Sequence, residues 1–278
     1  MPVRTRVETK LKAILRDCLP PVIVRQLRKI SASKALLGSS RDLGAHKSEH
    51  EGEPWNAIYQ RQAQPFLVAT ADLRYHGGMA FTASQHHFIQ YYHRGAPALE
   101  EFYQRHQPRN IFEQHFIESP DQPTRLNGLP WSIAHTAAFS GEEGLDHTHG
   151  RQQYGPVSRK KINLEVRRLN AVMESIRKFG YKETLGFPRG YFLENDKGCL
   201  RFLVVGGQHR VAAISFLSAD PVAVTFQPNW PRIIRRTDVR QWPQVRAGNV
   251  SVDLALAVFD AYFRNPQINL WSSKSKDG

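Results

Sequence analysis

The stretch Arg201-Phe-Leu-Val-Val-Gly-Gly-Gln-His-Arg-Val-Ala-Ala-Ile-Ser-Phe-Leu217 carries the clearest fold signal in this chain. Residues 203–205 are aliphatic and predict a short buried strand. Gly206 and Gly207 then allow a tight turn with backbone angles that other residues avoid. The apolar residues 211–217 predict a helix that packs on this strand. The stretch therefore predicts a strand–turn–helix unit.

The turn in this unit is suited to bind an anion. A helix that begins directly after a glycine turn presents free N–H groups and the positive end of its dipole. His209 and Arg210 add two basic side chains there, next to Gln208. We therefore expect Gly206, Gly207, Gln208, His209 and Arg210 to hold a phosphate. The alternative is a plain strand–turn–helix with a surface arginine, because short glycine motifs are weak signals alone.

The charge of the chain favours anionic partners. In its 278 residues, 38 Lys and Arg outnumber 25 Asp and Glu, for a net charge of +13. This excess fits nucleotides, nucleic acid or an anionic membrane surface, and it does not choose among them. The two cysteines, Cys18 and Cys199, lie far apart, so neither a disulfide framework nor a CxxC zinc pattern is present. A reducing, cytoplasmic setting is expected.

The amino-terminal region is basic and amphipathic. Residues 1–31 predict a helical segment that can lie on the anionic inner face of the membrane, or dock on the protein's own core. The run Leu19-Pro-Pro-Val-Ile-Val-Arg-Gln-Leu-Arg-Lys29 is similar to the starts of enzymes of bacterial surface-polysaccharide assembly. Residues 32–53 are polar and aperiodic and predict a linker.

The pattern becomes regular only in the second half of the chain. Residues 54–149 predict an irregular helical extension, and residues 150–265 a domain, followed by a tail at 266–278. Within the domain we expect these elements: a helix ending at Gly180, a hairpin of strands at 190–192 and 199–205, the glycine turn and its helix, a strand at 221–226, and a helix at 252–263.

Three short motifs of this chain, and the order of the elements that carry them, resemble those of the fold shared by sulfiredoxin and the amino-terminal domain of the partition protein ParB. They are Glu174-Ser-Ile-Arg-Lys-Phe-Gly180, Val205-Gly-Gly-Gln-His-Arg-Val-Ala-Ala213 and Pro221-Val-Ala-Val-Thr225. The resemblance covers about residues 150–230. It implies an α+β fold with a small mixed sheet and packed helices.

In that superfamily the Gly-x-His-Arg turn holds nucleotide phosphates, and one branch phosphorylates free serine. The resemblance implies that Gly207, His209 and Arg210 hold phosphates and that Glu165 is the catalytic base. A first-turn glutamate that complements the helix dipole is the alternative role for Glu165. Gln208 stands where sulfiredoxin has its cysteine, and Gly206 where the kinase branch has an acid.

Further polar residues are candidates for the same pocket: Arg168, Tyr154, Asp146 and His147. His147 and His149 form a His-x-His pair that can hold a divalent metal, or can simply share an exposed loop. Glu142, Glu143 and Asp146 could instead help to hold magnesium on a nucleotide. The arginines between 232 and 240, with Trp230 and Trp242, could bind single-stranded nucleic acid, or equally a nucleotide tail, a sugar phosphate or anionic lipid.

These signals lead to one favoured function and two alternatives. We expect an ATP-dependent phosphotransferase, with Mg²⁺, acting on a hydroxyl of a small molecule or glycan. A ParB-like nucleic-acid-binding protein or nuclease, and a non-catalytic nucleotide-sensing module, are the alternatives.

Overall fold

A computed structural model describes residues 54–59, 64–120, 126, 128–132, 142, 144–181, 184, 186–218 and 221–264. The basic segment 1–31, the linker 32–53 and the tail 266–278 of the sequence prediction lie outside the described residues. Within the described ranges, no helix combines the length and the apolar composition that crossing a bilayer requires.

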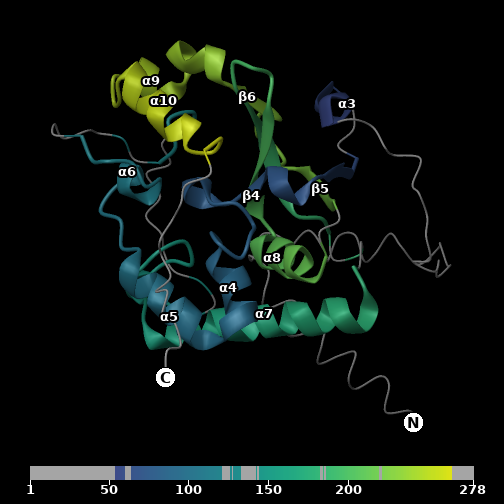
Figure 1. Ribbon diagram of the computed structural model, residues 1–278. Coiled ribbons are helices and arrows are strands. Elements are labelled where there is room, and N and C mark those ends of the chain that lie inside the picture. The colour runs from purple at the N-terminus through teal and green to yellow at the C-terminus, as the bar shows by residue number, and fades with distance from the viewer. Residues whose placement is uncertain are drawn as a thin grey trace, which may run out of the picture.

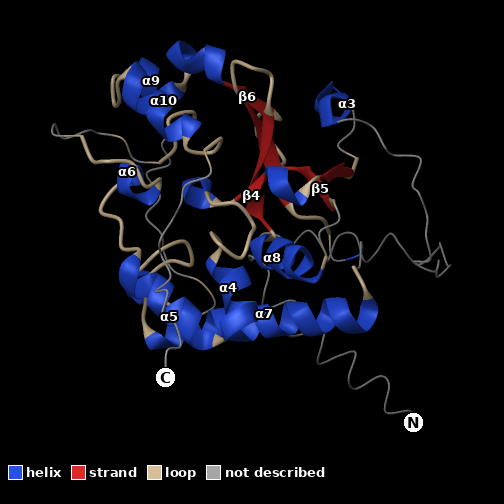
Figure 2. Ribbon diagram, viewed as in Figure 1, coloured by secondary structure: helices blue, strands red, loops and turns tan. Residues whose placement is uncertain are grey.

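Six strands in the described part of the chain form one mixed sheet (Figure 2). Its order is β1-β5-β3-β4-β2, and β6 pairs with β3 beside β5. The β1–β5 and β3–β4 pairs are antiparallel, whereas β2–β4, β3–β5 and β3–β6 are parallel. The strands are β1 (Phe66–Val68), β2 (Leu73–Arg74), β3 (Arg189–Glu194), β4 (Leu200–Gly206), β5 (Val222–Phe226) and β6 (Ile233–Arg235).

The hairpin of β3 and β4 sets the register at the centre of the sheet. Its turn is closed by Asn195, whose side-chain Oδ1 accepts from the backbone N–H groups of Lys197 and Cys199 at 3.0 and 2.9 Å. Pairing then runs regularly from the turn until a bulge next to Gly190. The bulge brings Arg189 opposite Gly206.

Helices cover both faces of this sheet (Figure 1). On one face lie α4 (His87–Arg94), α5 (Ala96–Arg105), α7 (Arg159–Phe179) and α8 (Gln208–Leu217). On the other lie α6 (Ile111–Gln114), α9 (Pro243–Arg246) and α10 (Val252–Asp260), while α3 (Pro54–Tyr59) lies near β1.

Alternation along the strands explains why both faces are covered. Phe192, Phe202 and Val204 point to the α7–α8 side, whereas Tyr191 and Leu203 point to the α10 side. Successive side chains of a strand project to opposite faces, so strands that are apolar on both faces need two helical layers.

The elements expected in the second half of the chain are confirmed. The helix before Gly180 is α7, the hairpin is β3–β4, the strand at 221–226 is β5, and the last helix is α10. The α+β class with a mixed sheet and packed helices is likewise confirmed.

The first half of the described chain differs from the expected irregular helical extension. Its strands β1 and β2 extend the sheet, pairing with β5 and β4. Phe66 and Phe88 share one core cluster with Phe202 and Phe226, so no core boundary lies at residue 150. These strands are three and two residues long, too short for sequence periodicity to reveal.

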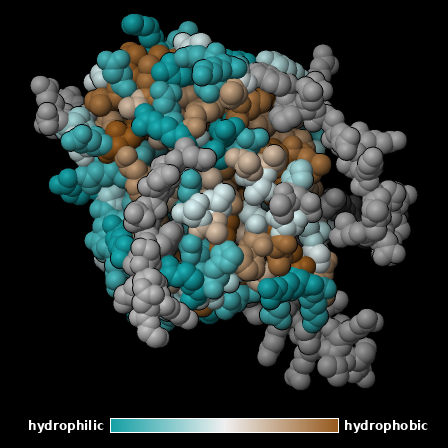
Figure 3. All heavy atoms as spheres, viewed as in Figure 1, coloured by the Kyte–Doolittle hydropathy of each residue, from teal (hydrophilic) through white to brown (hydrophobic). Residues whose placement is uncertain are grey.

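The exposed apolar side chains are dispersed over several elements. Figure 3 shows hydrophilic groups on the viewed face interrupted by apolar ones, with brown spheres over α9 and α10. Among the described residues, the large exposed hydrophobic side chains are Tyr59, Leu67, Phe179, Leu217 and Trp230. Scattered residues of this kind are normal for a folded surface.

Candidate functional site

The diglycine turn has the geometry that the sequence predicts. Gly207 adopts the left-handed conformation, with φ at +81°, and α8 begins at the next residue. A Cβ at Gly207 would lie 2.9 Å from the Cα of Pro188. The turn therefore needs glycine for its backbone angle and also for the close approach of the neighbouring segment.

The side chains of the first turn of α8 diverge towards different parts of the fold. Gln208 accepts a hydrogen bond from Gln152, His209 contacts Glu165, and Arg210 donates to the backbone carbonyl of Gly186. The structure therefore gives His209 and Arg210 different partners, rather than aiming both at one point.

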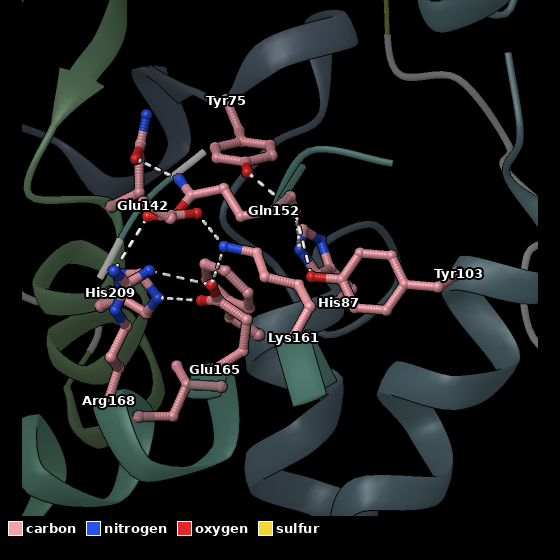
Figure 4. A network of polar contacts seen from close by, with 12 residues as sticks. Tyr75, His87, Tyr103, Glu142, Gln152, Lys161, Glu165, Arg168 and His209 are labelled. Carbon is pink, nitrogen blue, oxygen red and sulfur yellow. Dashed lines mark hydrogen bonds and ion pairs between the residues drawn. The ribbon is translucent and has the colours of Figure 1, made fainter. Parts of the chain in front are cut away.

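Glu165 lies fully buried on α7 and faces the start of α8 (Figure 4). Its Oε2 is 2.5 Å from the Nε2 of His209. Its Oε1 is 2.7 Å from the Nζ of Lys161 and 2.9 Å from the Nη1 of Arg168. Positions 161, 165 and 168 share one helix face because they are separated by four and three residues. Glu165 therefore lies next to the helix that follows the glycine turn.

The surrounding charges keep Glu165 ionised. Burial alone would raise the pKa of its carboxyl, but the charge and hydrogen bond of His209, followed by the charges of Lys161 and Arg168, outweigh burial. The pKa of Glu165 is held well below its usual range. A carboxylate stabilised so strongly is a weak proton acceptor, so it orients its partners better than it takes up a proton.

A second carboxylate closes the cluster from a different segment. Glu142 contacts the Nζ of Lys161, and its Oε2 is 2.8 Å from the Nη2 of Arg168. Lys161 is fully buried and Arg168 nearly so, while Glu142 is 28% exposed. Buried charges must be paired, and here two carboxylates neutralise two cations, while Glu165 also contacts the imidazole of His209.

His209 occupies the boundary between this cluster and solvent. Its imidazole stacks on the ring of Phe88 from α4, with centroids 4.6 Å apart and an angle of 18°. Its side chain is 16% exposed, whereas that of Glu165 is 0% exposed. Among the described residues no hydrogen-bond partner of its Nδ1 is found. His209 is therefore the member of the Glu165–His209 pair that can meet a ligand.

Gln152 connects the cluster to α4 and α5. Its backbone carbonyl oxygen receives the Tyr103 hydroxyl at 3.0 Å, the His87 Nε2 at 3.1 Å and the Tyr75 hydroxyl at 3.5 Å. Burial raises the pKa of both tyrosines and lowers that of His87 to about 3, so all three are neutral donors. The Gln152 side chain donates to Gln208 at 2.7 Å, which fixes the start of α8.

Several of these partners are absent from the sequence prediction. Lys161, Phe88 and Tyr103 were not candidates, although the spacing of Lys161, Glu165 and Arg168 is a helical one that could have grouped them. Phe88 and Tyr103 carry no such signal, because only tertiary packing brings α4 beside α8 and α5 beside α7.

The remaining pocket candidates lie apart from the cluster. Asp146 caps the turn His147–His149 by accepting from the backbone N–H of Thr148 at 2.9 Å. His149 bonds through Nδ1 to the hydroxyl of Ser158, the N-cap of α7, at 2.7 Å. His147 is exposed, and Tyr154 forms a backbone bridge with Arg151.

No group of three His, Cys, Asp or Glu side chains that could hold a metal lies among the described residues. The metal role expected for His147 and His149 stays a prediction, because no third ligand lies beside them among the described residues. A shallow hollow of about 420 Å³ lies along the later turns of α7, lined by Asn170, Met173, Glu174, Arg177 and Lys178. It includes no member of the Glu165 cluster.

The basic segment after β5 is largely paired within the fold. Arg235 bonds to Glu194 at 2.9 Å, and Arg236 bonds to Asp196 and Asp260 at 2.5 and 2.8 Å. Arg232 lies over the ring of Phe226. Arg235 and Arg236 are therefore less available to contact a nucleic-acid backbone, whereas Arg240 is exposed.

No protein-family model, no curated protein and no solved structure matches this chain. The resemblance to ParB and sulfiredoxin therefore stays a prediction from short motifs.

Proposed function

We propose that this protein is a nucleotide-dependent phosphotransferase that acts on a hydroxyl group of a small molecule or glycan. One observation carries the proposal. The ionised carboxylate of Glu165 bonds at 2.5 Å to an imidazole in the first turn of a helix that follows a diglycine turn. This places a proton-transfer group next to a backbone geometry suited to phosphate.

The geometry favours His209 as the proton acceptor and Glu165 as its positioning residue. When Glu165 accepts the Nε2–H of a neutral imidazole, the Nδ1 lone pair stays free to take a proton. The ionised Glu165 then stabilises the imidazolium that forms. This arrangement modifies the expected role of Glu165, which was that of the base itself.

The start of α8 would hold the phosphates of ATP or a related nucleotide. Gly206 and Gly207 are partly exposed although Pro188 packs closely on Gly207, Arg210 supplies a guanidinium, and the helix dipole favours negative charge. Phosphate chemistry implies Mg²⁺, which would offset phosphate charge when bound. Mg²⁺ is commonly held by substrate phosphates and one or two carboxylates, so we expect that ion to enter with the nucleotide.

Binding and turnover test the proposal separately. Calorimetric titration of ATP with Mg²⁺ should show binding that falls at least about tenfold in Arg210→Ala and is unchanged in Arg240→Ala, a charge-matched variant at an exposed position. His209→Gln should retain nucleotide binding, while release of ADP falls about 10²- to 10⁴-fold. Urea unfolding of each variant controls for loss of the fold.

The outcomes separate the competing functions. Absence of ATP binding in the wild-type protein, or equal binding in Arg210→Ala, would overturn the proposal. Binding without any turnover would favour the nucleotide-sensing module instead. The proposal also includes a role in surface-polysaccharide assembly, with the acceptor hydroxyl on a small molecule or glycan. It further includes contact of residues 1–31 with an anionic membrane.

A further inference from the structure

Residues 186–189 run alongside the start of α8. A Cβ on Gly206 would meet the Nε and Nη2 atoms of Arg189 at 3.4 Å, and Arg210 donates to the carbonyl oxygen of Gly186. These contacts align the two segments in antiparallel order. They place Arg189 at one end of the diglycine turn and Arg210 at the other.

The charges of Arg189 and Arg210 are not neutralised within the described part of the chain, where no carboxylate forms an ion pair with either. Other arginines of the fold do have such partners there: Arg168, Arg201, Arg235 and Arg236. Burial, together with the charge of Arg210, lowers the pKa of Arg189. The two guanidinium groups therefore repel each other across the turn.

An anion between two such groups would replace repulsion with attraction. A guanidinium forms paired hydrogen bonds to phosphate oxygens, and partial burial strengthens each of them. Gly206 has no side chain, so nothing separates the guanidinium of Arg189 from the backbone of the turn. A Cβ at this position would already lie in contact with that guanidinium. Gly206 and Gly207 are both partly exposed, so the same anion could also contact the backbone of the turn.

We propose that Arg189 and Arg210 form a clamp for two neighbouring phosphate groups of a nucleoside di- or triphosphate. This inference deepens the proposed function, since it rests on the diglycine turn being the nucleotide site. It adds Arg189, a residue from β3, as the group that distinguishes an oligophosphate from a monophosphate. A single phosphate can use Arg210 alone, whereas a chain of phosphates spans both ends of the turn.

Calorimetry with three probes tests the clamp: ATP, AMP and inorganic tripolyphosphate. Arg189→Ala should weaken ATP and tripolyphosphate at least about tenfold and AMP less than about threefold. Arg189→Lys keeps the positive charge but loses the planar guanidinium with its paired donors. Its affinity for ATP and tripolyphosphate should therefore lie between that of Arg189→Ala and that of the wild-type protein. Arg240→Ala is the charge-matched control and should bind all three probes as the wild-type protein does.

The results distinguish this inference from the phosphotransferase proposal. Equal ATP and tripolyphosphate affinities in Arg189→Ala and the wild-type protein would overturn the clamp, even if His209→Gln abolished turnover. An equal loss of affinity for AMP and ATP in Arg189→Ala would also overturn the clamp, because Arg189 would then not distinguish a chain of phosphates from a single phosphate. Selective loss in Arg189→Ala without any turnover by the wild-type protein would support the clamp and refute the enzyme.

Discussion

Acid should unfold this protein steeply, because several of its histidines are buried in the neutral state. Burial lowers the pKa of His106 and His115 to about 4 and that of His87 to about 3, from an ordinary value near 6.5. Burial also holds the pKa of His86 well below that value. Protonation would place a charge in the core, where none of these four rings forms an ion pair with a carboxylate of the described residues.

The direction and size of the effect follow from proton linkage. As pH falls below 6.5, the unfolded chain binds a proton at each histidine, while the folded chain does not until about pH 4. The free energy of unfolding therefore falls with pH across this window, by up to about 1.4 kcal/mol per pH unit for each histidine. Four such groups together lower the free energy of unfolding by up to about 5.6 kcal/mol per pH unit, which rivals the whole stability of a typical domain.

His106→Phe isolates one of these contributions. The His106 ring stacks on Phe116, with centroids 4.6 Å apart and an angle of 20°, and its buried Nε2 has no hydrogen-bond partner among the described residues. Phenylalanine preserves the stacking and cannot bind a proton. Relative to its stability at pH 7, the variant should lose about 2 kcal/mol less than the wild-type protein on going to pH 5.

The assay is urea unfolding, followed by tryptophan fluorescence and circular dichroism at several pH values between 7 and 4.5. His147→Phe is the matched control, because the His147 side chain is exposed and its replacement should leave the pH dependence unchanged. A wild-type unfolding free energy that is flat from pH 7 to 5 would refute the reasoning. So would identical pH slopes for His106→Phe and the wild-type protein.

Two further predictions concern packing. Tyr191→Phe removes the acceptor of the buried Trp131 indole N–H, now 2.9 Å away, and should cost about 1–3 kcal/mol of unfolding free energy. Tyr91→Phe, which loses a bond to Asn170 at an exposed site, should cost under about 0.5 kcal/mol; similar losses for both variants would contradict burial as the cause. Gly207→Ala should cost about 3 kcal/mol or more, because Ala meets Pro188 at 2.9 Å and also adopts a left-handed backbone. Gly198 has a similar φ but open space around it, so Gly198→Ala should cost only about 1–2 kcal/mol of unfolding free energy. Equal decreases in melting temperature for Gly207→Ala and Gly198→Ala would contradict a clash with Pro188 as the cause.

Sequence patterns predict the half of the fold in which the elements are long and regular. The stripe of α7, the β3–β4 hairpin and the glycine turn before α8 each contain enough periodicity or turn chemistry to be recognised locally. The strands β1 and β2 could not be found in this way. They are strands only because β5 and β4 offer them edges to pair with.

The sequence by itself determined that Gly206, Gly207, His209 and Arg210 stand where a strand ends and a helix begins. Tertiary structure decided what each of them meets. Helical geometry turns consecutive side chains about 100° apart, so His209 turns towards Glu165 and Arg210 towards the segment before β3. A one-residue bulge then places Arg189 opposite Gly206, and no local pattern in the chain encodes that register.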